Sequence, residues 1–154
     1  MRSSYGLLAG PAFSISNACA GIWFGKVADK TNRSKLLAFM AIAWSMTTII
    51  TGSVNSLAVM AMMRFGLGLF QAACEPLIFS LINDTIPKDK VPFANSIVKA
   101  APYAGSALSS LNVIAIATLG WRGCCLGMGM TGIFVGLLAL LTTKEPTRGA
   151  LEAE

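Results

Sequence analysis

The sequence GKVADKTNRSK, residues 25–35, collects charged and polar side chains between two long runs that contain no charge. The preceding run covers residues 3–25, and the following run covers residues 36–63. A helix needs about 20 apolar residues to cross the roughly 30 Å hydrocarbon core of a bilayer, and both runs reach this length. Residues 25–35 are therefore expected to form a polar turn between two membrane-spanning helices.

Composition favours the same interpretation for the whole chain, because 55% of the 154 residues are hydrophobic and only 12% are charged. A soluble domain has a charged fraction of about 25%. Further charge-free runs cover residues 100–121 and 123–143, and a fifth apolar stretch near residues 57–82 is interrupted only by Arg64 and Glu75. Because lipid offers the backbone no hydrogen-bond partner, apolar segments of this length are expected to be helices.

The sequence thus predicts an all-α fold, a polytopic transmembrane bundle of five helices in a single domain that covers residues 1–154. A turn near SVNS, residues 53–56, separates the second helix from the third. The expected spans are residues 4–25, 36–54, 57–83, 93–118 and 122–142, with boundaries that are approximate. The chain is accordingly expected to be a multi-pass integral membrane protein, in contact with membrane lipids.

The net charge of +5 is distributed unevenly between the two sides of these spans. If residues 26–35 face the cytoplasmic or equivalent side, residues 84–92 and 144–154 face it too. That side then carries Lys26, Lys30, Arg33, Lys35, Lys88, Lys90, Lys144 and Arg148, whereas the other side carries Arg2 and Arg122. Such an excess of basic residues indicates orientation. It does not indicate nucleic-acid binding, because no soluble surface gathers these residues into a patch.

The sequence contains no group of residues typical of an enzyme. It has no histidine, no cluster of metal ligands, and no nucleophile beside a recognisable base. The cysteines fall inside the expected spans, where small packing residues are expected rather than disulfides or zinc ligands. These cysteines are Cys19, Cys74, Cys124 and Cys125. We expect no catalytic residue, no metal and no cofactor.

Small residues recur at helical spacing in the first and last expected spans. The first span carries Gly10, Ser14, Asn17, Gly21 and Gly25 at intervals of three or four. The last span repeats the pattern with Cys125, Gly129, Gly132 and Gly136. Such stripes let the backbone of a neighbouring helix approach closely, so both are predicted to be packing faces.

Polar residues in the third span also share one face. Arg64, Gly68, Gln71 and Glu75 lie at i, i+4, i+7 and i+11, with about 16 Å between Arg64 and Glu75 along the axis. An ionisable group at membrane depth is costly and usually faces protein or a water-filled cavity. Pro76 removes a hydrogen bond to the carbonyl of residue 72, so a bend is predicted beside Glu75.

The fourth span carries a second polar stripe, which includes Lys99. Its members are Asn95, Lys99, Pro102, Ser106 and Ser110. Since the third and fourth spans are antiparallel, Glu75 and Lys99 are expected at comparable depth, where they can form a buried ion pair. In the alternative interpretation, Arg64 and Lys99 extend to opposite membrane interfaces and Glu75 is neutral. The sequence leaves both interpretations open.

Residues 25–35 match the pattern Gly-x-x-x-Asp-Arg/Lys-x-Gly/Asn-Arg/Lys-x-Arg/Lys, which is carried by Gly25, Asp29, Lys30, Asn32, Arg33 and Lys35. This pattern resembles the loop between the second and third helices of major facilitator superfamily transporters. RFGLGLFQAACEP, residues 64–76, resembles the fourth helix of that family, and AAPYAGSAL, residues 100–108, resembles its fifth. GWR at 120–122 and KEPTRGALE at 144–152 resemble segments that flank the sixth helix in the spinster-like branch.

The resemblance covers the family's second to sixth helices, and so an incomplete N-terminal half. It implies that residues 25–35 form a gate motif, in which Asp29 engages a helix end of the opposite half and, with Arg33, stabilises the outward-open state. The remaining gate residues are Gly25, Lys30 and Lys35. A neutral amide, Gln71, stands where the resemblance leads us to expect an acid, so proton coupling would have to use Glu75.

The resemblance supports two functions. The chain is expected to be a portion of a secondary transporter for a lipid-like or small organic solute, with Arg64, Gln71, Glu75 and Lys99 as candidates for transport or coupling. Five helices of one half are not expected to transport alone, because family members rock two halves around a shared site. The alternative is a transporter-derived, non-transporting subunit of a larger membrane complex. In either case, other transmembrane helices or subunits are expected to cover the open face of the bundle.

Overall fold

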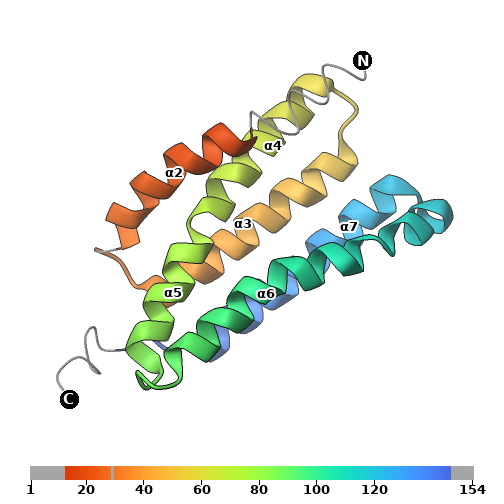
Figure 1. Ribbon diagram of the computed structural model, residues 1–154. Helices are drawn as coiled ribbons and strands as arrows, with labels where there is room; N and C mark the ends of the chain where they lie inside the picture. The colour runs from red at the N-terminus through yellow and green to blue at the C-terminus, as the bar shows by residue number, and fades with distance from the viewer. Residues whose placement is uncertain (1–12, 29, 147–154) are drawn as a thin grey trace.

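The computed structural model describes residues 13–28 and 30–146, and within these ranges the fold is entirely helical (Figure 1). The helices are α2 (Phe13–Ala28), α3 (Arg33–Ser53), α4 (Leu57–Ala72), α5 (Cys74–Thr85), α6 (Val91–Ser109) and α7 (Asn112–Thr142). The structure therefore confirms the all-α fold class. Figure 1 shows α3 lying between the α4–α5 segment and α7, with α2 beside α4.

The polar turn between the first two described helices is shorter than the expected segment 26–35. Helix α2 continues to Ala28, and α3 already begins at Arg33. The side chain of Asn32 explains this start, because its amide oxygen accepts a hydrogen bond of 2.9 Å from the backbone N–H of Lys35 and so caps α3. Most of the charged motif thus lies on helix ends rather than in a loop.

The expected third span is one apolar segment that is interrupted at Ala73. Helix α4 ends at Ala72 and α5 starts at Cys74, so the predicted bend near Pro76 is confirmed. The missing N–H of Pro76 leaves the carbonyl of Ala72 without its helical partner, which explains the position of the break. Figure 1 shows the two helices following one another along the bundle.

The sequence predicts a single helix over residues 93–118, but the structure divides this segment between two helices. Helix α6 ends at Ser109, the chain turns, and α7 starts at Asn112. Within α7 the chain kinks at Gly120, whose φ of 72° favours glycine. This kink falls between the fourth and fifth expected spans.

In the described part of the chain, three helical segments are long and apolar enough to cross a membrane. These segments are Arg33–Ser53, Leu57–Thr85 and Asn112–Thr142. The expected first span, 4–25, lies partly outside the described residues.

The glycine stripe of the last span forms the close packing that the sequence predicts. A Cβ atom added at Gly136 would lie 2.7 Å from Cγ1 of Ile42, and one at Gly129 or Gly132 would collide with Ile49 or Ser45 of α3. The stripe of α7 therefore lets α3 approach its backbone directly.

The stripe predicted for the first span is not a close-packed face where the structure describes it. Ser14 is exposed, and nothing lies within 4 Å of a Cβ added at Gly21. Helix α2 instead packs beside α4, and Ala20 is its buried apolar residue. Gly10 lies outside the described residues.

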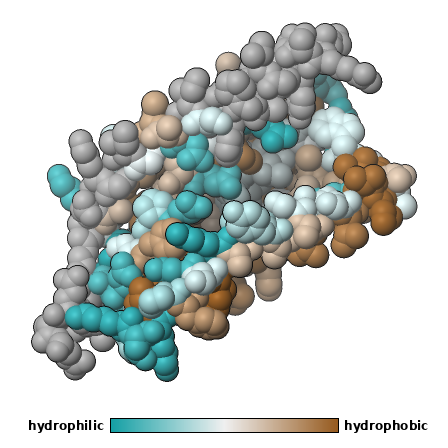
Figure 2. Space-filling view, in the orientation of Figure 1, coloured by the Kyte–Doolittle hydropathy of each residue, from teal (hydrophilic) through white to brown (hydrophobic). Residues whose placement is uncertain are grey.

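Packing is uneven across the bundle. A small apolar core of Met40, Ala73 and Leu77 joins α3 to the break between α4 and α5. Helix α6, by contrast, has no buried residue. Large apolar side chains are exposed along α6 and α7, and Figure 2 shows brown surface at the end where α6 passes into α7. Such exposure is expected of helices that face lipid.

Candidate functional site

The gate motif lies at one end of the bundle, where α2 ends and α3 begins. Gly25 is part of α2, and Asp29 lies outside the described residues. Lys30 and Lys35 are exposed, whereas Arg33 is only 5% exposed. A buried guanidinium carries a large desolvation cost unless acids and other acceptors surround it. Arg33 is therefore the residue of this motif from which the site is built.

Arg33 binds two carboxylates and a hydroxyl. Its Nη2 atom lies 2.5 Å from Oδ2 of Asp84, and its Nε donates to Oε1 of Glu145 at 3.0 Å. Its Nη1 donates to Oγ of Ser80 at 2.5 Å. The planar fork of an arginine has several donors in fixed directions, so one side chain can serve all three partners. We call Arg33, Ser80, Asp84 and Glu145 the ionic cluster.

Glu145 also binds the first turn of α3. Its Oε2 accepts a hydrogen bond of 2.8 Å from the backbone N–H of Ser34, whose hydroxyl donates to the carbonyl of Lys144 at 3.2 Å. Burial alone would raise the pKa of Glu145, but the bonds from Ser34 and the charge of Arg33 outweigh it and lower that pKa below its ordinary value. Glu145 is thus an anion at a helix N-terminus, where negative charge is favoured.

The ionic cluster joins three segments that are far apart in the sequence. These are the start of α3, the last turns of α5, and the segment that follows α7. The three segments that the sequence analysis places on one side of the membrane therefore meet at one end of the bundle. Such a cluster holds the helix ends in one arrangement. If those ends separate, the ion pairs of Arg33 must break.

Sequence reasoning identified Arg33 but not its acidic partners. The sequence does carry a signal, because Asp84 follows the third expected span and Glu145 follows the last one, both on the same side as the motif. An acid beside a span end on a basic side is a candidate partner for a motif arginine. The distribution of charges between the two sides of the membrane indicates orientation but does not identify which acid pairs with Arg33.

The polar stripe of the third span is divided between the inside and the outside of the described bundle. Gly68 is buried, Arg64 and Gln71 are half-buried, and Glu75 is exposed. The break at Ala73 separates Gln71 on α4 from Glu75 on α5.

Of the two interpretations that the sequence leaves open, the buried pair of Glu75 and Lys99 is not formed in the described chain. Both residues are exposed, and the ion pairs formed among the described residues do not join them. The reason is that α6 makes few contacts with α5 and α7 and buries none of its residues. Lys99 therefore lies on an uncovered helix, and Glu75 on an uncovered face of α5.

A smaller polar contact closes the opposite end of the bundle. Arg122, two residues after the kink of α7, donates from Nη2 to Oδ1 of Asn55 in the turn between α3 and α4. Its guanidinium also lies 5.2 Å from the centre of the Trp121 ring, within the range of a cation–π contact. Both ends of the α3–α7 pair are thus joined by an arginine.

Comparison with protein families gives a match over nearly the whole chain. The sequence profile of the Major Facilitator Superfamily matches residues 2–154. The chain is 27% identical to a "Probable sulfoacetate transporter" of Cupriavidus necator over 135 residues, which are 87% of this chain and 31% of that protein. It is 25% identical to a "Probable L-galactonate transporter" of Escherichia coli over 126 residues, which are 81% of this chain and 28% of that protein.

Solved structures give the same result for the fold. A bacterial homologue of the human lysosomal transporter Spinster, inward-facing and occupied, superposes with a TM-score of 0.80 at 29% identity, over 97% of this chain and 38% of that one. The inward-facing, unoccupied form gives a TM-score of 0.78 at 28% identity, over 94% and 36%. The chain therefore spans about a third of the length of the relatives it matches.

Proposed function

Because the chain belongs to the Major Facilitator Superfamily, we propose that it is a portion of a multi-pass secondary transporter for a small organic solute. The ionic cluster is the observation that carries this proposal. A buried arginine of the gate motif, held by acids from two other segments, is a device for holding helix ends together in one state and releasing them in another. If the helix ends did not move, apolar side chains of similar volume could stabilise them as well as a buried ion pair does.

Organic anions are the solute class that we propose within the broader group of lipid-like or small organic solutes. Sulfoacetate and L-galactonate, which the names of two relatives carry, are both small anions. Arg64 is half-buried within the α4–α5 segment, and Lys99 lies uncovered on α6. A fixed positive charge at membrane depth attracts an anion and offers it charge-assisted hydrogen bonds.

Coupling is assigned to Glu75 rather than to Gln71. Gln71 is half-buried on α4 and carries an amide, which is not an acid, whereas Glu75 carries a carboxyl group. In this proposal further helices of the transporter cover Glu75 at the start of α5 and the exposed face of α6, and so complete the solute site. The same faces can serve the alternative, a non-transporting membrane subunit, and Gln71 favours that alternative.

A chimera tests the proposal directly. The matching segment of the Cupriavidus necator transporter is replaced by this chain, and uptake of radiolabelled sulfoacetate is measured in a strain that lacks its own transporter. We expect the chimera to take up the anion, and Glu75→Gln to reduce its uptake by at least about tenfold if proton transfer passes through that residue. Leu141→Gln, at an exposed position near the end of α7, serves as a matched control for the introduced amide.

One result would contradict the proposed transport, and another would contradict only the role of Glu75. A folded, membrane-inserted chimera without uptake, together with capture of this chain in a stable complex with a different membrane protein, would favour the non-transporting subunit. Uptake that is unchanged in Glu75→Gln would leave transport standing but remove Glu75 from coupling.

A further inference from the structure

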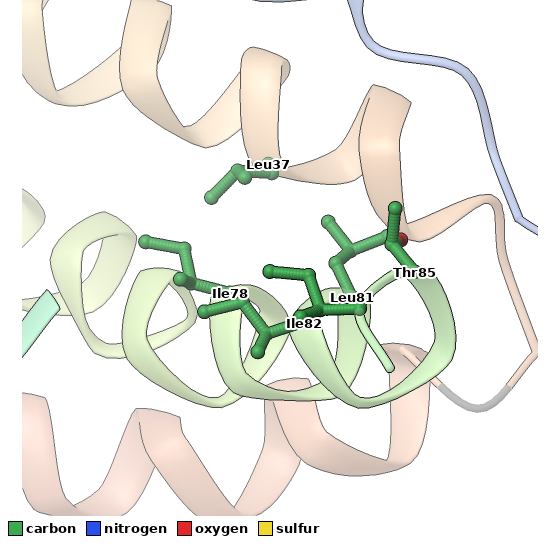
Figure 3. Close-up of a pocket in the computed structure, with 6 residues that line it drawn as sticks. Leu37, Ile78, Leu81, Ile82 and Thr85 are labelled. Carbon is green, nitrogen blue, oxygen red and sulfur yellow. The ribbon is translucent and has the colours of Figure 1, made fainter. Parts of the chain in front are cut away.

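An apolar groove opens between the first turns of α3 and the second half of α5, beside the ionic cluster (Figure 3). Its volume is about 230 Å³, and its lining is formed by Leu37, Ile78, Leu81, Ile82, Thr85 and Ile86. In Figure 3, Leu37 of α3 lies across the groove from the side chains of α5. The groove is open to the outside of the bundle rather than enclosed.

The length of the groove along α5 matches the outer part of the hydrocarbon layer of a membrane. Its lining on α5 extends from Ile78 to Ile86, which is about 12 Å along a helix axis. At one end, the groove lining stops at the end of the apolar segment Leu57–Thr85. On α3, the lining residue Leu37 lies one helical turn after the start of the segment Arg33–Ser53. The groove therefore runs from the membrane interface on the basic side into the hydrocarbon.

Two lysines lie in the turn that directly follows Ile86, the last residue of the groove lining. The turn after Ile86 is closed by a hydrogen bond of 2.9 Å from the backbone N–H of Lys90 to the carbonyl of Pro87, and it exposes both Lys88 and Lys90. Asp89 is exposed between them, so this turn carries a net charge of +1 from two lysines and one aspartate. Figure 2 shows teal, hydrophilic surface at the end of the bundle where α5 turns into α6.

We propose that the groove holds one acyl chain of an anionic phospholipid, whose headgroup phosphate binds Lys88 and Lys90. The groove alone cannot select a lipid, because lipid tails are as apolar as its lining. Selection comes from the lysines, since each basic residue near an anionic surface favours binding by about fivefold. Asp84 and Glu145, which also lie at this end, are already paired with Arg33 and do not oppose the phosphate.

The charge beside the groove, rather than its shape, favours an anionic lipid over another apolar helix. An apolar helix offers the exposed Lys88 and Lys90 no anionic group, whereas a lipid headgroup does. Lipid binding at this place does not depend on the proposed transport, because neither Arg64 nor Glu75 lines the groove.

Photocrosslinking in vesicles tests the proposal. The full chain is reconstituted in phosphatidylcholine vesicles that contain a trace of photoactivatable phosphatidylglycerol or of photoactivatable phosphatidylcholine with the same acyl chains. Labelled peptides are then mapped by mass spectrometry. We expect phosphatidylglycerol to label peptides that contain residues 37 and 78–86 at least about fivefold more than phosphatidylcholine does.

Two pairs of variants separate the headgroup from the groove. Lys88→Ala with Lys90→Ala should abolish the preference for phosphatidylglycerol, whereas Lys144→Ala, an exposed lysine at the same end, should retain it. Ile82→Trp should fill the groove and reduce labelling by both probes, whereas Ile114→Trp, an exposed site outside the groove, should not. Because Lys88 and Lys90 are exposed, their variants remain informative if Ile82→Trp fails to fold.

Three outcomes would overturn the proposal. The first is equal labelling of the groove by the two probes, and the second is a preference that survives loss of both lysines. The third is a groove that neither lipid labels, for instance because residues 147–154 or a second copy of the chain crosslinks there instead.

Discussion

The α3–α7 pair and helix α6 differ sharply in how closely they pack against other helices of the described chain. Helix α3 approaches α7 along Gly129, Gly132 and Gly136, and the ends of the pair are joined by polar contacts of Arg33 and Arg122. Helix α6 buries no residue and leaves Lys99 uncovered. Helices α3, α6 and α7 all carry large exposed apolar side chains, so apolar character alone does not decide which helices pack.

The difference follows from the physics of helix association in lipid. Helices in a bilayer gain nothing from burying apolar side chains, so they associate where small residues allow close backbone contact and where polar groups pair. The α3–α7 pair has both features. Helix α6 has a glycine, Gly105, but nothing lies within 4 Å of a Cβ added there. We therefore expect close packing of α6 to come from contacts outside the described bundle.

The largest expected effect comes from removing the centre of the ionic cluster. Arg33→Ala leaves Asp84 and Glu145 without their common cation, and loss of one partner of a buried ion pair costs about 3–5 kcal/mol. We expect the free energy of unfolding, measured by denaturant titration in mixed micelles, to fall by this amount. Lys35→Ala removes an exposed charge two residues away and should change it by less than about 0.5 kcal/mol.

Arg33→Lys refines the same prediction. A lysine keeps the charge but not the planar fork, so it cannot serve Asp84, Glu145 and Ser80 in one geometry. We expect a stability between those of the unmodified chain and Arg33→Ala. A lysine variant as stable as the unmodified chain would mean that charge alone, and not the geometry of the cluster, holds the helix ends.

The next effect in size concerns the glycine stripe. Gly129→Leu places a side chain against Ile49 and the carbonyl of Ser45, and overpacking of this kind costs about 1–3 kcal/mol. Gly127→Leu is the matched control on the same helix, because a Cβ at that position has nothing within 4 Å. We expect thermal unfolding in nanodiscs to shift downward for Gly129→Leu alone. Equal shifts for both variants would show that the loss arises from the helix itself and not from contact with α3.

A smaller, pH-dependent effect should come from Glu145. Its pKa lies below the ordinary value of about 4.3, so the anion stabilises the fold above that pH, and this contribution is lost as the pH falls through the lowered pKa. Glu145→Gln should therefore be less stable than the unmodified chain at neutral pH, by about 1–3 kcal/mol. The two should converge in strong acid. A difference that is the same at both pH values would exclude ionisation of Glu145 as its origin.

The accuracy of sequence reasoning follows the same division between the two regions. The stripe of α7 and the bend near Pro76 could be predicted, because both are local consequences of residue spacing and of proline chemistry. The partners of Arg33 could not be read from spacing, since Asp84 and Glu145 are 51 and 112 residues away in the sequence and meet it only through the fold. The pairing of Glu75 with Lys99 failed because it assumed that two polar faces of neighbouring helices must meet.

The smallest expected effect comes from substitutions in α6. These substitutions test directly whether α6 contacts lipid or other helices. Tyr103 is 79% exposed and Ile97 is 56% exposed, so Tyr103→Ala or Ile97→Ala in this chain alone removes contacts with lipid or detergent rather than with protein. We expect either substitution to change the free energy of unfolding by less than about 0.5 kcal/mol. In the chimera described above, further helices are available to cover α6, and the same substitutions should then cost about 1 kcal/mol or more if they do. Both variants are measured in both contexts, in this chain alone and in the chimera, by thermal unfolding in nanodiscs.

An equal and negligible effect in both contexts would mean that lipid remains the partner of this face of α6, and would contradict the expectation that other helices cover it.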